Sequence, residues 1–351
     1  MAKILMKGNE VMAEAAIRCG CKLYFGYPIT PQSDLPEYMA AHLPKAGGVF
    51  LQPESEVSVI NMLGGAWATG TRAMTSTSSP GVALMQENIS NLAGSEIPCV
   101  VVNVSRGGPG AGNLSANQGD YNQATRGGGN GDYHMLVVSP GSVQEACDLV
   151  QKAFDLAEKY RNPVMVLTDA MMGQMMEAVD IKYVTPPETD KSWAAVGFSE
   201  KSRKRAQLGS LYFDEPNCER AILKMHEKYE RAAREDTLWE EYLTEDAECI
   251  LVAYGVASRL AFAAVDQLRE QGVKAGLFRP ISLYPYPARQ LRDAVGRECV
   301  KKVVTVEMSD GQMHQDVLIS LQGMKPTYLY NRVGGYMPMP EDVAAFVKGL
   351  V

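Results

Sequence analysis

Four short polar segments each follow an apolar, strand-like run in the first 110 residues. They are Gly26-Tyr-Pro-Ile-Thr-Pro-Gln-Ser33, Gln52-Pro-Glu-Ser-Glu56, Thr75-Ser-Thr-Ser-Ser-Pro-Gly81 and Ser105-Arg-Gly-Gly-Pro-Gly110. Because the carboxyl ends of parallel strands meet at one edge of a sheet, these segments would bring hydroxyls, carboxylates and a guanidinium into one cleft. Their convergence predicts a ligand site more strongly than any one segment does.

Two acidic residues stand at the start of an apolar run. Glu54 and Glu56 flank Ser55, directly before VSVINMLGGAWATG. One interpretation is structural: Ser55 caps a helix and the acids favour its positive end. The other is that a carboxylate buried beside this helix manages a proton on a ligand. The residues alone leave both interpretations open.

The other polar segments also allow a chemical and a structural interpretation. The serines and threonines before Gly81 could cradle an anion at a helix start, or could simply cap the helix. Arg106, at the end of CVVVNVS, suits two-point recognition of a carboxylate, or is a surface arginine at a strand end. The dinucleotide motif GxGxxG and the phosphate loop GxxxxGK[ST] are both missing from the sequence, which counts against NAD and ATP enzymes.

The elements that must position these segments follow from hydrophobic periodicity. Apolar strands alternate with amphipathic helices through residues 1–170, which predicts a parallel sheet with helices on both faces. The Gly-rich segment 107–132 predicts a functional loop, although a connection without a ligand also fits. The expected strands are 22–27, 48–52, 74–77, 99–104, 135–138 and 164–168, and the expected helices are 8–19, 55–69, 82–92 and 143–160.

The remaining chain divides by composition. Residues 186–247 are charged and have a helical pattern at 219–243, which predicts a linker arm with a solvated helix. From Glu248 the alternation resumes with CILVAYG, KAGLF, KKVVTVEM and TYLYNRV, separated by helices near 258–271, 288–295 and 312–321. This pattern predicts a second, smaller parallel-sheet domain.

Composition narrows the class of partner. The chain has 351 residues, with 34 Lys and Arg against 41 Asp and Glu, and this acidic balance counts against nucleic acid. We expect no membrane span, because the apolar runs are short. Seven cysteines, mostly in apolar runs, predict buried, reduced thiols and a cytoplasmic location. Neither the cysteines nor the four histidines have metal-ligand spacing, so we expect no metal site in this chain.

Taken together, the segments resemble the α subunits of 2-oxoacid:ferredoxin oxidoreductases. The four polar segments match in order and spacing, followed by Gln118-Gly-Asp120. In the second domain, Phe278-Arg-Pro-Ile-Ser-Leu-Tyr-Pro-Tyr-Pro287 and Val306-Glu-Met-Ser-Asp-Gly-Gln312 are similar as well. The resemblance covers nearly the whole chain, and the arm is its least diagnostic part. Chain length and the form of the arm most resemble the branched-chain, 3-methyl-2-oxobutanoate type.

The resemblance implies both a fold and an activity. Residues 1–185 would form the pyrimidine-binding domain of a thiamine diphosphate enzyme, 186–247 a linker arm, and 248–351 a transketolase C-terminal-like α/β domain. The activity would be coenzyme A-dependent oxidative decarboxylation of a 2-oxoacid to acyl-CoA and CO2, with reduction of ferredoxin. We expect a branched-chain 2-oxoacid as the substrate, with 2-oxoglutarate or pyruvate as the alternatives.

The resemblance also assigns residues. Glu56 would be catalytic, because its carboxyl group would bond the aminopyrimidine ring and so assist removal of the thiazolium C2 proton. Thr30 would contact the substrate carbonyl or carboxylate, and Arg106 would pair with the carboxylate. The residues expected at the cofactor are Tyr27, Pro28, Ile29, Glu56, Ser78 and Ser79.

One family motif is missing. Thiamine enzymes hold the diphosphate and Mg²⁺ with Gly-Asp-Gly and a later Asn, whereas this sequence has Gly119-Asp-Tyr and Gly131-Asp-Tyr. The resemblance therefore implies that a β subunit supplies the diphosphate half of the site. It also implies a γ subunit, a ferredoxin-like δ subunit and [4Fe-4S] clusters carried by partners, with ferredoxin as acceptor.

Two other classes of protein stay open at this point. A free-standing thiamine-dependent decarboxylase or carboligase would bind the cofactor and turn over without a partner chain. The missing Gly-Asp-Gly motif counts against it. A non-catalytic α/β scaffold would tolerate replacement of Glu56.

Overall fold

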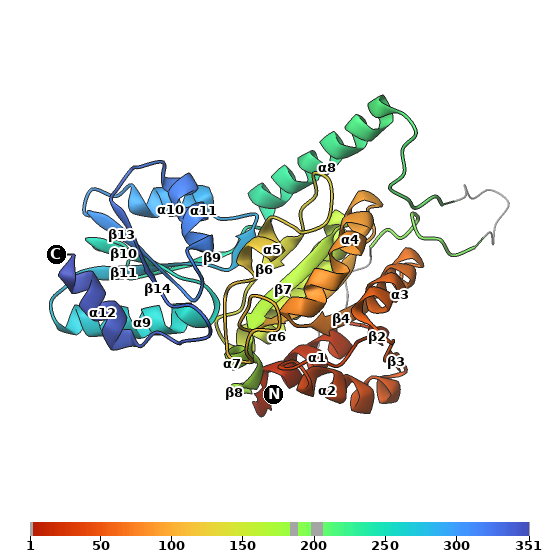
Figure 1. Ribbon diagram of the computed structural model, residues 1–351, viewed down its shortest axis with the longest axis horizontal. Coiled ribbons are helices and arrows are strands. Elements are labelled where there is room, and N and C mark those ends of the chain that lie inside the picture. The colour runs from red at the N-terminus through yellow and green to blue at the C-terminus, as the bar shows by residue number, and fades with distance from the viewer. Residues whose placement is uncertain (1–2, 183–188, 198–205, 351) are drawn as a thin grey trace.

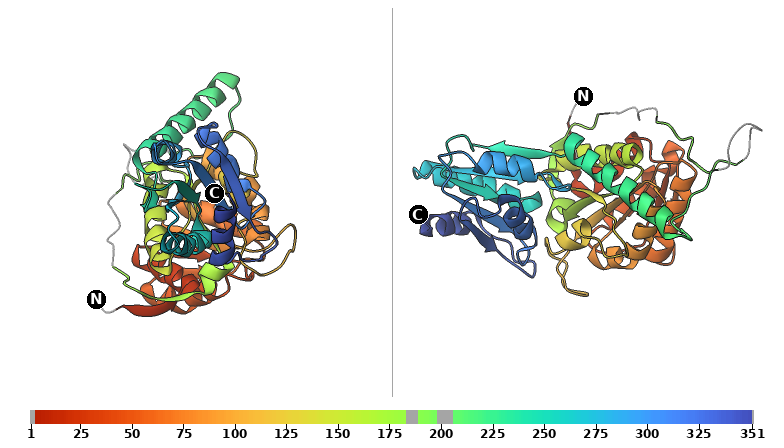
Figure 2. Two further views of the ribbon diagram at one scale, coloured as in Figure 1. Left: turned by 90° about the vertical axis from the view of Figure 1, so that its left-hand side faces the viewer. Right: turned by 90° about the horizontal axis from the view of Figure 1, so that it is seen from above.

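The computed structural model describes residues 3–182, 189–197 and 206–350. Two sheets, each with its own helices, lie side by side along the long axis of the molecule (Figures 1 and 2). The helix α8 (Glu215–Glu235) runs over the larger, seven-stranded sheet and projects beyond it (Figure 1). The predicted α/β architecture with helix-covered, mostly parallel sheets is confirmed.

The larger sheet has seven strands in the order β12-β6-β7-β5-β4-β2-β3. All its pairs are parallel except β12 with β6. The strands are β2 (Leu23–Phe25), β3 (Val49–Leu51), β4 (Ala73–Thr77), β5 (Cys99–Ser105), β6 (Leu136–Val138), β7 (Pro163–Asp169) and β12 (Ser282–Tyr284).

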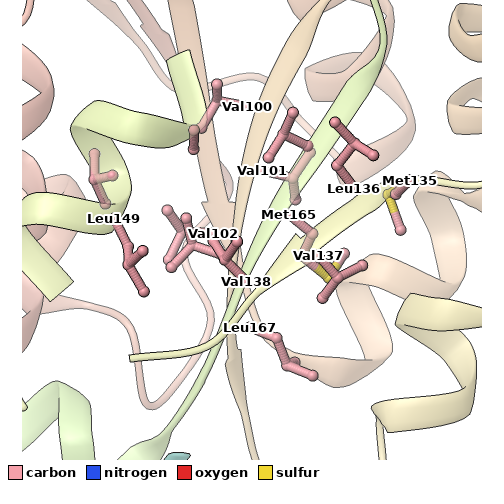
Figure 3. Close-up of a cluster of buried hydrophobic side chains, with 14 of the residues drawn as sticks. Val100, Val101, Val102, Met135, Leu136, Val137, Val138, Leu149, Met165 and Leu167 are labelled. Atoms are coloured by element: carbon pink, nitrogen blue, oxygen red, sulfur yellow. The ribbon is translucent and has the colours of Figure 1, made fainter. Parts of the chain in front are cut away.

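The centre of this sheet is apolar because β5 and β7 are buried at every position. Strands covered on both faces read as continuous runs rich in valine and leucine, as CVVVNVS and PVMVLTD do. Figure 3 shows their side chains together with those of β6 in one buried cluster. This core holds the carboxyl ends of the strands in fixed positions.

The helices of the first part connect its strands. They are α1 (Gly8–Arg18), α2 (Asp34–His42), α3 (Glu56–Ala68), α4 (Ser79–Gly94), α5 (Tyr121–Thr125), α6 (Val143–Tyr160) and α7 (Ala170–Gln174), with a 3₁₀ turn at Pro44–Ala46. A separate antiparallel ribbon pairs β1 (Ile4–Lys7) with β8 (Met176–Val179).

The smaller sheet has five strands in the order β14-β13-β10-β11-β9. In Figure 1 it lies between α10 and α11 on one face and α9 and α12 on the other. Its strands are β9 (Trp239–Tyr242), β10 (Cys249–Val252), β11 (Ala275–Pro280), β13 (Lys302–Glu307) and β14 (Thr327–Asn331), and its helices are α9 (Gly255–Glu270), α10 (Ala288–Val295), α11 (Gln312–Leu321) and α12 (Pro340–Gly349).

The helix predicted at 219–243 is wrong at both ends. The structure has α8 at Glu215–Glu235, because Asp214 caps it by accepting a hydrogen bond from the Asn217 amide. The last predicted helical residues instead form β9, which pairs antiparallel with β11. The helix is also not wholly solvated, since it buries Met225, Tyr229 and Ala232 against the body of the protein.

The two predicted domain boundaries can be compared with the path of the chain through the two sheets. The boundary at 185/186 lies outside the described residues. The boundary at 247/248 falls inside the smaller sheet, because β9 before it and β10 after it both belong to that sheet, whereas β12 later returns to the larger one. The exchange ties the two parts together.

Two further expectations concern the whole chain. All seven cysteines are free, and five are fully buried. Burial raises the pKa of the Cys99 thiol to about 12, as for an inert core residue. Among the helices of the described residues, none is long and apolar enough to cross a membrane.

Candidate functional site

The four polar segments singled out in the sequence meet at one edge of the larger sheet. They follow β5, β4, β2 and β3, which are consecutive neighbours, and each pairing among them is parallel. All four segments therefore leave the sheet at its carboxyl edge, as predicted. Ligands of open α/β sheets bind at this edge.

The loop after β2 is held by a chain of buried hydroxyl and amide groups. The Tyr24 hydroxyl lies 2.6 Å from Ser76 Oγ, which donates to Gln32 Oε1 at 2.5 Å. Gln32 Nε2 then donates to the Tyr27 carbonyl at 3.3 Å. The loop is thus rigid at its base, while its predicted contact residues are exposed or half-buried: Tyr27, Pro28, Ile29 and Thr30.

The two acidic residues before α3 occupy different environments. Ser55 is the helix cap and accepts a hydrogen bond from the Ser58 amide at 3.3 Å, so the structural interpretation is correct for Ser55. Glu54 is exposed and bonds the Ser58 hydroxyl. Glu56 is only 5% exposed, and within the described residues its carboxylate has no hydrogen-bond or ion-pair partner. A buried carboxylate without a partner points to a ligand.

The Glu56 side chain lies against the start of α4. A Cβ atom added at Gly81 would lie 2.8 Å from Glu56 Oε1 and 2.0 Å from Thr77 Oγ1. Such contacts are too short for any side chain larger than glycine. The first turns of α3 and α4 therefore enclose the carboxylate, and Gly81 is what permits this close approach.

Three hydroxyl groups in β4 and in the turn before α4 are also unpartnered. Thr75, Thr77 and Ser78 are buried, and their side-chain oxygens find no hydrogen-bond partner among the described residues. Ser78 is the N-cap residue of α4 by position, yet its side chain makes no capping bond. Capping therefore does not explain these hydroxyls, and a polar ligand at this edge would satisfy them.

Arg106 joins three of the segments. Its Nη1 donates to the Thr30 carbonyl at 2.8 Å, and its backbone amide donates to Ser79 Oγ at 3.0 Å. The Nε atom is buried without a partner in the described part of the chain. Nη2 also donates to the Ala111 carbonyl at 3.3 Å, so both terminal nitrogens are engaged by backbone carbonyls and the unpartnered Nε leaves a donor for an anion such as a carboxylate.

Asp120 is a site residue to which sequence reasoning gave no role. Its Oδ2 accepts hydrogen bonds from Ser79 Oγ at 2.6 Å and from Asn103 Nδ2 at 2.8 Å. Burial raises the pKa of the Asp120 carboxyl group. With Ser79 it lines a cleft of about 630 Å³ that reaches Ser309 and Gln312 of the smaller sheet's part. The Gly-rich segment is thus part of a cleft, as expected for a functional loop.

Glu307, at the end of β13, is a second residue that the sequence did not single out. It is fully buried and accepts hydrogen bonds from Ser309 Oγ at 3.0 Å and from the Met313 amide at 2.9 Å, at the start of α11. Burial raises the pKa of its carboxyl group to about 7. Because neither its burial nor its neighbours follow from local sequence, only the folded structure reveals it.

The raised pKa of Glu307 predicts how stability depends on pH. The folded chain binds this proton more tightly than the unfolded chain, so the contribution of Glu307 to stability is fully present below pH 4.5 and is lost as pH rises through about 7. The loss should be about 3 kcal/mol, since one pKa unit is worth about 1.4 kcal/mol. Urea unfolding of the full chain at several pH values measures it, and Glu307→Gln should remove this part of the slope. An unchanged slope in the variant contradicts the assignment.

Comparison with known proteins places this geometry in a family. Residues 14–241 match the family described as pyruvate flavodoxin/ferredoxin oxidoreductase, thiamine diphosphate-binding. Residues 247–343 match the pyruvate:ferredoxin oxidoreductase core domain II. The unpartnered carboxylate of Glu56 and the free hydroxyls beside it fit a thiamine diphosphate-binding domain, because the polar edge of an aminopyrimidine ring offers such groups both donors and acceptors.

Two individual relatives agree with this family assignment. The chain is 44% identical to the ketoisovalerate oxidoreductase subunit VorB of Methanothermobacter thermautotrophicus, over 99% of this chain and 98% of that one. It is 37% identical to the 2-oxoglutarate synthase subunit KorA of the same organism, over 96% of each chain.

Solved structures show the same fold. The 2-oxoglutarate:ferredoxin oxidoreductase of Magnetococcus marinus, solved with 2-oxoglutarate, coenzyme A and succinyl-CoA, aligns with a TM-score of 0.88 at 27% identity. The alignment covers 99% of this chain and 65% of that one. A split-gene transketolase aligns with a TM-score of 0.60 at 17% identity, and this similarity shows the fold alone. The chain therefore belongs to the family of 2-oxoacid:ferredoxin oxidoreductase α subunits.

Proposed function

We propose that this chain supplies the pyrimidine half of a thiamine diphosphate site that it shares with a β subunit. The reaction is coenzyme A-dependent oxidative decarboxylation of a branched-chain 2-oxoacid, with ferredoxin as electron acceptor. The observation that carries the proposal is the buried, unpartnered carboxylate of Glu56 beside the free hydroxyls at the start of α4. When bound, the cofactor supplies an electron sink for decarboxylation.

The chain's own residues have separate roles in this proposal. Glu56 holds a proton at the aminopyrimidine edge, and the low dielectric around it strengthens that hydrogen bond. Arg106 binds the substrate carboxylate through its free Nε, and Thr30 lies beside it. Tyr27, Pro28 and Ile29 would contact the cofactor from the loop after β2. Ser78 and Ser79 would contact it from the start of α4.

An exposed apolar surface beside Glu56 supports a shared site. Val57 and Met62 on α3 are 42% and 39% exposed, and Leu84 on α4 is 55% exposed. The neighbouring edge strand β3 exposes Val49 and Leu51 as well. Apolar surface of this kind marks an interaction site. We assign it to the β subunit, which would bring the diphosphate and Mg²⁺ against the start of α3 and α4.

Family membership supports a proposal for the other partners. A γ subunit, a ferredoxin-like δ subunit and the [4Fe-4S] clusters would belong to the assembled complex, with the clusters on partner chains. Coenzyme A would receive the acyl group. The similarity to VorB over 99% of the chain supports this assembly and the branched-chain substrate.

The lining of the cleft also favours a branched-chain substrate. Pro80, Ala83, Leu84, Pro109 and Val333 give the cleft apolar walls. Among the described residues that line it there are two aspartates and no lysine or arginine. Arg106, which would bind the first carboxylate, is not part of this lining, so a second carboxylate, as in 2-oxoglutarate, would meet no further charge partner in the cleft.

The experiment is a substrate panel on the reconstituted complex. We expect kcat/KM for 3-methyl-2-oxobutanoate to exceed that for 2-oxoglutarate and pyruvate by about tenfold or more, since a filled apolar pocket discriminates by this much per methyl group. Coenzyme A-dependent reduction of ferredoxin or a viologen dye gives the rates. Preference for 2-oxoglutarate contradicts the substrate assignment. Turnover by this chain alone contradicts the shared site and favours a free-standing decarboxylase.

A further inference from the structure

The Gly-rich loop that leads to Asp120 is anchored by the part of the chain built on the smaller sheet. The backbone amide of Gln118 donates to the Met308 carbonyl at 3.0 Å, and its Oε1 accepts from the Met308 amide at 2.8 Å. Its Nε2 donates to the Tyr254 carbonyl at 2.9 Å. Gln118 is 3% exposed. Buried, satisfied bonds of this kind fix a loop in one position.

The residues after Gln118 are held from the same side. Gln312 Nε2 donates to the Gly119 carbonyl, and Gln312 Oε1 accepts from the Asn122 amide, both at 2.8 Å. Tyr121 and Arg126 both donate to the Asp316 carboxylate on α11. Asp120 therefore stands between two anchored stretches of backbone, and its own backbone has little freedom to move.

The Asp120 side chain points the other way, toward the 2-oxoacid site. Its Oδ2 accepts from Ser79 Oγ and Asn103 Nδ2, at 2.6 and 2.8 Å. Ser79 Oγ in turn accepts from the Arg106 amide at 3.0 Å. Hydrogen bonds from Met308, just after β13, and from Gln312 on α11 thus fix the backbone around Asp120, and the bonds of its side chain lead on to the residue proposed to bind the substrate carboxylate.

We propose that Asp120 is a positioning residue that couples the C-terminal part of the chain to the 2-oxoacid site. The inference rests on the proposed function for what the site binds, but the hydrogen bonds themselves do not depend on it. It also gives the C-terminal part a role, because Met308 and Gln312 hold the loop that places Asp120 under Ser79 and Arg106.

The first test compares Asp120→Ala with Asp120→Asn in the assembled complex. Alanine removes both acceptor bonds, and we expect kcat/KM to fall about 30-fold, mainly through a higher KM, because Arg106 loses its support. Asparagine offers an oxygen at the same place, so it should stay within about threefold of wild type. The matched control is Asp132→Ala, in the second Gly-Asp-Tyr of the loop, where the aspartate is exposed.

The outcomes separate the possible roles. Wild-type kinetics in Asp120→Ala overturn the proposal. Equal losses in the alanine and asparagine variants also overturn it, because they would show that the charge itself acts in the reaction. If the wild-type complex fails to act on any 2-oxoacid, it is the proposed function that fails.

The second test does not depend on activity. Gln312→Ala removes the two bonds to Gly119 and Asn122 from a partly buried position that tolerates truncation. We expect amide hydrogen exchange in residues 117–126 to become at least about tenfold faster, while exchange in β5 and β7 stays unchanged. Unchanged exchange in residues 117–126 overturns the proposal, including when Asp120→Ala fails to assemble.

Discussion

Replacing Glu56 with glutamine in the assembled complex is expected to lower kcat for 2-oxoacid oxidation by about a thousandfold, within the range of general acid–base contributions. Glutamine has the size of glutamate but cannot exchange a proton at the aminopyrimidine. The site that encloses this side chain, between the starts of α3 and α4, should otherwise be preserved. Steady-state reduction of ferredoxin by variant and wild-type complexes measures the effect.

The control for this experiment lies two residues away. Glu54 carries the same functional group but is exposed and accepts a hydrogen bond from the Ser58 hydroxyl. Glu54→Gln should therefore keep wild-type kinetics. A Glu56→Gln complex that works within about threefold of wild type would remove this residue from the mechanism and would favour a structural role for the motif.

Arg106 should show the second largest effect, and it should appear in KM. Arg106→Met removes the free Nε donor and the charge, so we expect KM for the 2-oxoacid to rise about 100-fold, as for loss of a charge-assisted pair. Arg106→Lys keeps a charge but not the planar fork, and should raise KM about tenfold. Saturation kinetics with 3-methyl-2-oxobutanoate distinguish these values from an effect on kcat.

A surface arginine serves as the control for the Arg106 variants. Arg289 on α10 is 90% exposed at its side chain, and its contact with Asp293 spans 3.9 Å. Arg289→Met should leave KM unchanged. Should Arg106→Met also leave KM unchanged, the substrate carboxylate binds elsewhere.

The main strands and the meeting of the polar segments could be predicted from the sequence. Long apolar runs such as CVVVNVS signal buried parallel strands whatever lies around them, and parallel strands place their following loops at one edge. Strands β9 and β12 could not be predicted, because their stability comes from distant partners. Strand β12, three residues long, exists through its pairing with β6, and β9 exists through its pairing with β11.

The residues that sequence reasoning missed in the site share one property. Asp120 has its role through Ser79 and Asn103, and its loop is held by Met308, at a sequence separation of 190 residues from Gln118. Local spacing carries no information about such contacts. The burial of Glu56, by contrast, could be predicted from the sequence, because the apolar helix that buries it follows directly after it.

The most direct test follows the thiazolium C2 proton of thiamine diphosphate bound to the assembled complex. Quenched-flow exchange into deuterium oxide, read by proton NMR, gives its rate in wild type and in Glu56→Gln. We expect the cofactor to stay bound in the variant while exchange of the C2 proton slows by at least about 100-fold. Equal exchange rates in the two complexes, with equal amounts of cofactor bound, would contradict it.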